Sequence, residues 1–197
     1  MSFAVLTLLM ACGAPQQKSE PVIISNTEAV PNPPEPVEEI VIAPTIPNSA
    51  MIANYVSGKP PFYAYITPRN SSSKSTVIAF ENEMAPRIVL DDTYGAILQS
   101  LRFPEFDSDL LFVTARLKDP NFNKYFLYVL KNGRWKEVVN GWAIHKSNNP
   151  QELSPIVVDP ENPNNMKRFY SVFDLDEESA GVYSWHLLEE SIPIKNR

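Results

Sequence analysis

Stretches in which apolar and polar residues alternate recur along residues 49–197, separated by loops rich in Pro, Asn, Asp, Ser and Gly. A period of two places successive side chains on opposite faces of a β-strand, whereas a helix repeats every 3.6 residues. The last two stretches show this pattern well. One face of residues 168–175 carries Phe169, Ser171, Phe173 and Leu175, and one face of residues 182–188 carries Tyr183, Trp185 and Leu187, with Ser184 and His186 outside.

These stretches come in pairs, and each pair predicts a β-hairpin. An aromatic-rich strand, a polar loop and a second strand occur at residues 62–66 and 77–80, at 110–117 and 125–130, and at 168–175 and 182–188. A further hairpin is predicted between residues 125–130 and 134–139. Its loop is Asn132-Gly133, the dipeptide that a type I′ turn favours.

The remaining elements are shorter. Residues 87–90 and 95–103 predict two strands, although Asp91-Asp92-Thr93 could instead cap a short helix over residues 94–101. Residues 156–158 lie between prolines, which is typical of an edge strand. Residues 49–55 predict one or two helical turns with Ser49 as the N-cap.

Together these elements predict a mainly β domain over residues 49–197, whose antiparallel hairpins form a sandwich or half-barrel. The spacing of the hairpins, near fifty residues, also suggests a propeller or meander. Three such units would not close a propeller, which typically has four to eight blades. A domain of this length buries enough apolar surface to be stable without a metal or a disulfide.

Residues 12–48 have a different composition and predict a linker. Residues 13–48 contain eight of the chain's nineteen prolines. Proline lacks the amide donor that a ladder needs and favours polyproline II, so the linker could extend on the order of 100 Å. The apolar segment Ile40–Ala43 is either an exposed apolar segment within a disordered linker or an edge strand that adds to the domain or to a partner.

The chain begins with an uncharged apolar run, Phe3–Ala11, that ends in Leu9-Met10-Ala11-Cys12. The run is shorter than the roughly 20 residues that span a bilayer as a helix and is typical of a signal peptide. These four residues resemble the lipobox of bacterial lipoprotein precursors. The resemblance implies that residues 1–11 are removed, that the Cys12 thiol carries diacylglycerol, and that the mature protein is held to a membrane by acyl chains.

Two further features bear on the location. Gly13, and not Asp, follows the cysteine, and in the enterobacterial pattern this favours the outer membrane. Cys12 is the only cysteine of the chain, so the domain carries no disulfide. The alternative is a buried N-terminal strand or helix with an ordinary cysteine. It is disfavoured because the next forty residues offer such an element nothing to pack on.

The charge distribution excludes some partners. The net charge is −6; residues 13–50 carry Lys18 against five glutamates, a balance of −4, which leaves −2 for the rest of the chain. A nucleic-acid-binding domain would need a basic stripe, so no nucleic-acid partner is expected. Electrostatic docking on anionic lipid is also disfavoured, so membrane contact is expected to depend on Cys12.

No catalytic or metal-binding motif is present in the sequence, and no cofactor is expected. It lacks H-E-x-x-H, G-x-S-x-G, P-loop and Rossmann patterns. The acidic clusters at Asp107/Asp109 and Asp174–Glu178 lack the spacing of an EF-hand calcium loop, so solvated loops are expected. The two histidines, His145 and His186, are too far apart to form a local metal pair and are expected at the surface or in loops.

The three tryptophans, Trp135, Trp142 and Trp185, are candidates either for the core or for an exposed interaction surface. The sequence therefore predicts a non-catalytic lipoprotein of the cell envelope that binds a protein or glycan partner. The alternative is a hydrolase of envelope glycans, because two carboxylates that converge in a cleft need no linear motif.

Overall fold

We analysed a computed structural model that describes residues 45–70, 72–148, 152–176 and 181–196. These residues belong to one compact unit, Pro44–Arg197. The strands and the two 3-10 helices of the described residues are β1 (Met51–Ala53), β2 (Phe62–Ile66), β3 (Ser75–Phe80), η1 (Glu81–Glu83), β4 (Ile88–Asp91), β5 (Ala96–Leu101), β6 (Leu110–Arg116), β7 (Phe122–Lys131), β8 (Arg134–His145), η2 (Lys146–Asn148), β9 (Ile156–Val158), β10 (Asn165–Asp176) and β11 (Val182–Pro193).

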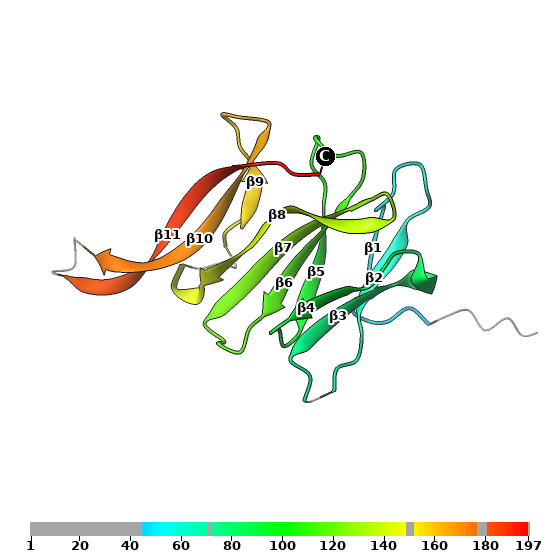
Figure 1. Cartoon of the computed structure of the whole chain (residues 1–197), viewed down its shortest axis with the longest axis horizontal. Helices are drawn as coiled ribbons and strands as arrows, with labels where there is room; N and C mark the ends of the chain where they lie inside the picture. The colour runs from blue at the N-terminus through cyan, green and yellow to red at the C-terminus, as the bar shows by residue number, and fades with distance from the viewer. Residues whose placement is uncertain (1–44, 71, 149–151, 177–180, 197) are drawn as a thin grey trace, which may run out of the picture. The chain divides into compact units, whose positions relative to one another are not determined.

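The strands form three antiparallel sheets (Figure 1). The first has the order β1-β2-β3-β4, the second β5-β6-β7-β8, and the third β11-β10-β9. Neighbouring strands within the first two sheets follow one another along the chain, so they are joined as successive hairpins. The predicted mainly β fold, built of antiparallel hairpins, is confirmed.

Strand β6 of the second sheet is buried on both faces, and its sequence shows why. Leu110–Ala115 is an almost unbroken apolar run, which is typical of a strand covered on both sides. Leu111, Val113 and Ala115 point to one core, while Leu110 and Phe112 point to the other.

The two cores connect the three sheets as a sandwich does. The first core packs the inner residues of β2, β3 and β4, among them Phe62, Ile78 and Leu90, against β6 and β7. The second core packs the opposite face of β6, β7 and β8 against Ile156 of β9 and Met166 of β10. The second sheet is thus the shared middle layer.

The four predicted hairpins are present. β2 pairs with β3, β6 with β7, β7 with β8, and β10 with β11. Asn132 and Gly133 join β7 to β8 with φ angles of 54° and 69°, and a type I′ turn requires a positive φ at both positions.

Of two predictions for short elements, one is confirmed and the other is wrong. Residues 96–101 form strand β5, as expected, and not the alternative helix. The predicted helical turn over residues 49–55 is wrong, because Met51–Ala53 is a strand. Ala53 pairs with Phe62, and this tertiary pairing outweighs a weak local preference for helix.

The third sheet is uneven in width. The short strand β9 pairs only with Met166–Arg168, so it is an edge strand, as the flanking prolines predicted. Beyond Arg168, β10 pairs within the described residues only with β11. The two strands extend from the other layers as a two-stranded hairpin, orange to red in Figure 1.

The lipobox with Cys12, the linker and the segment Ile40–Ala43 lie outside the described residues. Within the described part of the chain, none of the helices has the length and apolar character needed to cross a membrane.

Candidate functional site

An aromatic cluster lies where the β10–β11 hairpin meets the end of the second sheet. We call it the ribbon surface; its members are Phe122, His145, Phe173, Tyr183 and Trp185. Trp185 stacks on His145 with ring centroids 4.9 Å apart and planes inclined by 19°. Phe173 lies 5.0 Å from Trp185 and 5.6 Å from Tyr183, measured between ring centroids.

Strand register brings these residues together. Phe173 pairs with Trp185, and Leu175 pairs with Tyr183, so all four side chains leave the hairpin on one face. Phe122 opens β7 and is paired with His145 at the end of β8, which places both rings at the same corner of the second sheet. The cluster therefore combines four strands.

The cluster side chains of β10 and β11 share one face, as the sequence predicted. That face is largely exposed to solvent, which the sequence did not predict. Phe173 is 54% exposed and Tyr183 is 59% exposed. Of the eleven large hydrophobic side chains that are exposed in the described parts of the chain, six lie on this hairpin. The hairpin extends past the layer that would have covered it, so this apolar face meets solvent.

Polar contacts fix the base of the hairpin. The backbone amide of His145 donates to Ser171 Oγ at 2.8 Å, and Asn148 Nδ2 donates to the same oxygen at 2.6 Å. His145 Nδ1 lies 2.8 Å from Ser147 Oγ. These bonds hold the histidine ring where Trp185 stacks on it.

The hairpin is strongly acidic. Between Arg168 and Lys195 the sequence has no Lys or Arg and has six acidic residues. Glu189 and Glu190 form ion pairs with Lys167 and Arg168 at the base, at 3.1 and 2.8 Å. Asp174 and Asp176 lie at the far end of β10.

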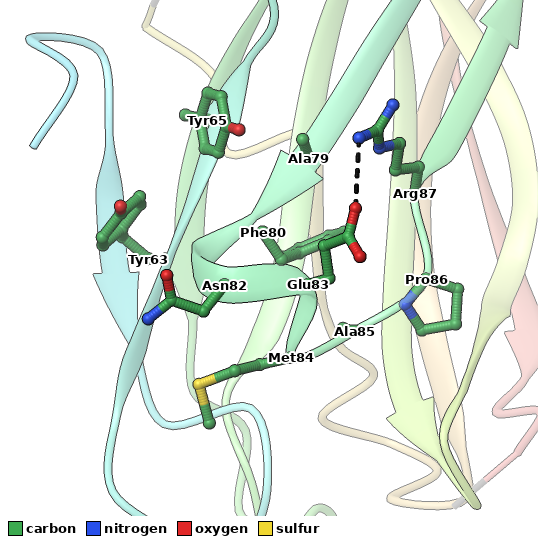
Figure 2. Close-up of a pocket in the computed structure, with 10 residues that line it drawn as sticks. All are labelled: Tyr63, Tyr65, Ala79, Phe80, Asn82, Glu83, Met84, Ala85, Pro86 and Arg87. Atoms are coloured by element: carbon green, nitrogen blue, oxygen red, sulfur yellow. Dashed lines mark hydrogen bonds and ion pairs between the residues drawn. The ribbon is translucent and has the colours of Figure 1, made fainter. Parts of the chain in front are cut away.

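A second feature is a pocket of about 660 Å³ on the outer face of the first sheet, which we call the tyrosine pocket (Figure 2). Alternation along β2 turns Phe62 and Ala64 inward and Tyr63 and Tyr65 outward. Figure 2 shows the two tyrosines on one side of the pocket and Arg87 on the other. Among the described residues, its lining is Tyr63, Tyr65, Ala79, Phe80, Asn82, Glu83, Met84, Ala85, Pro86 and Arg87.

A third feature is a groove of about 690 Å³ between the strands β5–β7 and the segment before β9. Phe112 and Tyr125, stacked at 5.7 Å, contribute to its lining, and Leu153 and Ile156 line the other side. None of the residues that line this groove, all within the described segments, is a carboxylate.

The three tryptophans have different positions. Trp142 is only 5% exposed and packs in the second core beside Phe112 and Tyr125, so it contributes to the interior. Trp135 is partly buried and stacks on Phe80 at 4.8 Å, against the first core. Trp185 alone belongs to the ribbon surface.

Asp109, of the Asp107/Asp109 cluster, has a structural role. Asp109 accepts from the backbone amide of Asn54 at 2.8 Å and lies 3.6 Å from Arg102, so it ties the connection after β1 to the loop before β6. Within the described segments, no group of three or more His, Cys, Asp or Glu side chains is arranged to hold a metal ion. His186 Nε2 bonds with Ser184 Oγ, on the opposite face of β11 from Trp185.

Shifted pKa values occur away from the ribbon surface and the tyrosine pocket. Burial raises the pKa of Tyr55 and Tyr128 above the usual tyrosine value, and it raises the pKa of Tyr125 as well. Hydrogen bonds from Ser191 and from the Glu161 amide lower the pKa of Asp159. Its contact with Glu189 raises the pKa of Lys167. Each of these pKa shifts arises from burial, a hydrogen bond or a charge contact within the fold, and none of the groups lines the tyrosine pocket.

Sequence reasoning missed the tyrosine pocket and most of the ribbon surface. The tyrosine alternation in FYAYI was visible, but pattern alone does not tell which face of a strand is covered. His145 was expected at the surface or in a loop. It lies half-buried at the end of β8, as part of the ribbon surface, and its ring contacts with Phe122 and Trp185 are set by register between distant strands.

Comparison with known proteins identifies no relative: no family model, no curated protein and no solved structure matches this chain.

Proposed function

We propose that this protein is a lipid-anchored, non-catalytic binding protein of the bacterial cell envelope. In this proposal acyl chains on Cys12 hold it to the membrane, and the linker carries the β domain away from the bilayer. The ribbon surface then contacts a partner protein. The anchor rests on the lipobox resemblance, and the partner rests on the exposed aromatic face of the β10–β11 hairpin.

The exposed aromatic face is the observation that carries the binding function. A two-stranded hairpin is marginally stable alone, and four large apolar side chains of this one, Phe173, Leu175, Tyr183 and Leu187, are exposed to water on the face that carries Trp185. Contiguous apolar patches of this kind are typical of protein contact surfaces, in which aromatic side chains contribute most of the affinity. A partner that covers Phe173, Tyr183 and Trp185 would remove this apolar surface from water.

The negative charge of the β10–β11 hairpin indicates which kind of partner surface it can bind. Asp174 and Asp176, at the far end of β10, favour a partner surface with an apolar centre and Lys or Arg at its rim. The same charge disfavours two other occupants. A second copy would bring two acidic hairpins together, and anionic lipid headgroups would repel the hairpin.

The alternative function, a glycan hydrolase, needs two carboxylates about 5 to 9.5 Å apart across a cleft. Glu83 is the one carboxylate that lines the tyrosine pocket, and the groove beside β9 has none in its described lining. This geometry favours binding over hydrolysis.

Site-specific photo-crosslinking in intact cells tests the partner contact. A photo-reactive phenylalanine analogue replaces Tyr183, and a matched chain carries it at Ile52, which has the same exposure (58% against 59%) on another sheet. We expect a discrete protein adduct from position 183 and none from position 52. The crosslinked partner peptide should contain Lys or Arg, and Asp174→Asn with Asp176→Asn should reduce the yield.

Three outcomes contradict this proposal: equal adducts at both positions, an adduct of the chain with itself, or no adduct at position 183. The anchor is tested separately with Cys12→Ser. We expect this variant to take up no labelled fatty acid and to leave the membrane fraction. Retention in the membrane together with an absence of label in both forms would contradict the anchor.

A further inference from the structure

We propose that the tyrosine pocket binds a saccharide, through a site separate from the ribbon surface. The pocket lies on the first sheet, whereas the ribbon surface is formed by the second and third sheets. Its volume, about 660 Å³, falls within the range of small-molecule sites, roughly 300 to 1,000 Å³.

One wall of the pocket is aromatic. Tyr63 and Tyr65 point outward from β2, with ring centroids 5.9 Å apart and planes inclined by 52°. Tyr65 is paired across the strands with Ala79, whose small side chain leaves the sheet surface hollow beside the ring. A sugar ring has apolar C–H faces that pack on aromatic rings, while the tyrosine hydroxyls can bond with its polar edge.

The rest of the lining is polar and carries both donors and acceptors: Glu83 and Arg87 lie across from the tyrosines, and Asn82 lies on the side of Tyr63 (Figure 2). Asn82 offers an amide, Glu83 a carboxylate and Arg87 a guanidinium. Glu83 and Arg87 form an ion pair at 3.4 Å (Figure 2), but their side chains are 84% and 62% exposed, so the pair is weak. A ligand hydroxyl can therefore bond with either group while the two charges still balance.

This combination of groups favours a sugar over other small ligands. A hydrocarbon would leave Asn82, Glu83 and Arg87 without new partners. A phosphate or carboxylate could pair with Arg87 only by displacing Glu83, whose charge would then lie unpaired beside the anion. Neighbouring sugar hydroxyls can donate and accept at once, which matches a pocket that offers an amide, a carboxylate and a guanidinium.

The backbone turn that carries Asn82 and Glu83 is fixed by hydrogen bonds. Asn82 and Glu83 have φ angles of 44° and 58°, and two successive residues in this region are costly unless the surrounding structure imposes them. The turn is imposed by Glu81: its carbonyl accepts from the Met84 amide at 2.8 Å, and its carboxylate accepts from the Tyr63 amide at 3.3 Å. The turn that positions Asn82 and Glu83 is thereby tied to the strand that carries the tyrosines.

Binding to an array of immobilised envelope and other polysaccharide fragments tests the proposal, with the labelled full chain in detergent as the probe. We expect the chain to be retained on at least one saccharide. Tyr65→Ala should weaken this binding by about tenfold or more. Asn82→Gly, which removes the amide and tolerates the positive φ, should weaken it as well without unfolding the chain.

The matched control is Tyr183→Ala, which removes an exposed tyrosine from the ribbon surface. We expect it to leave saccharide binding within about twofold, while Tyr65→Ala leaves the crosslinked adduct of the ribbon surface unchanged. Binding of no saccharide on the array, or equal binding by folded Tyr65→Ala and Asn82→Gly variants, would overturn the saccharide site. Neither result would affect the ribbon surface.

Discussion

Trp185 of β11 stacks on His145 at the end of β8, with ring centroids 4.9 Å apart. The two residues belong to different sheets, and their contact joins the protruding hairpin to the middle layer of the domain. Phe122 packs edge-on at the same corner, and its ring centroid lies 4.9 Å from the centroids of both His145 and Trp185. This corner therefore links the stability of the hairpin to the shape of the ribbon surface.

Trp185→Ala should loosen the hairpin. Because Trp185 is only partly buried, we expect the free energy of unfolding to fall by about 1 to 3 kcal/mol, less than for a fully buried tryptophan. Urea denaturation measures this change. The control is Val182→Ser at the exposed end of the same strand, where we expect a change within about 0.5 kcal/mol. Equal losses in the two variants would show that the stacking does not hold the hairpin.

The turn between β7 and β8 requires a positive φ at Gly133. Gly133→Ala should lower the free energy of unfolding by about 1 kcal/mol, since an L-residue is strained at φ 69°. A Cβ at this position meets no atom within 4 Å, so the loss would be conformational and not steric. Denaturant unfolding with Asn132→Gly as the control, expected within about 0.5 kcal/mol of the parent, checks this.

Two buried hydroxyls join the first sheet to the start of β5. Thr93 Oγ1 lies 2.8 Å from Thr76 Oγ1 and donates to the Leu90 carbonyl at 2.7 Å, while the Gly95 amide donates to Thr76 Oγ1 at 2.9 Å. Thr93→Val should cost about 1 to 3 kcal/mol, because the Thr76 amide also loses its acceptor.

The conservative control is Thr93→Ser, which retains the hydroxyl and should cost about 1 kcal/mol for the lost methyl group. Thermal or urea unfolding of both variants separates the hydrogen bonds from packing. If the valine variant is as stable as the parent, the hydroxyl network contributes nothing measurable.

Asp159 gives the domain a pH dependence. Ser191 donates to its carboxylate, and this bond, helped by the Glu161 amide, lowers the pKa of Asp159 in the folded state. A lowered folded-state pKa means that the contribution is complete above the unfolded value, about 3.9, and is lost as the pH falls through the folded value.

Asp159→Asn should therefore be less stable than the parent at neutral pH, and the difference should shrink below about pH 4. Unfolding midpoints in urea across this range measure it. Ser191→Ala, which removes the donor, should behave in the same way. The exposed Asp107→Asn should change the midpoint little throughout. A difference that stays constant down to acid pH would contradict the role of the Asp159 carboxylate.

Much of the secondary structure follows from local pattern. Alternation and turn residues located the four hairpins, and Asn132-Gly133 identified its turn type, because both signals depend on neighbouring residues alone. The same approach failed for residues 49–55, where it predicted a helical turn and the structure has strand β1. A three-residue strand such as β1 is stabilised by its pairing with β2 and carries little signal of its own.

The candidate sites were less predictable. Three tryptophans with similar sequence surroundings lie in the second core, against the first core and on the ribbon surface. Trp142 and Trp185 both alternate with polar or small neighbours, and only the layer that covers Trp142 distinguishes them.

By itself, the sequence determined where the four hairpins and their turns lie, and that Phe173, Leu175, Tyr183 and Trp185 share a face. Tertiary structure alone decided that this face lies open, that His145 stacks on Trp185, and that Tyr63 and Tyr65 line a pocket with Arg87. The reason is physical: side-chain direction along a strand depends on the backbone repeat, whereas burial depends on whether another layer of the fold lies over that face.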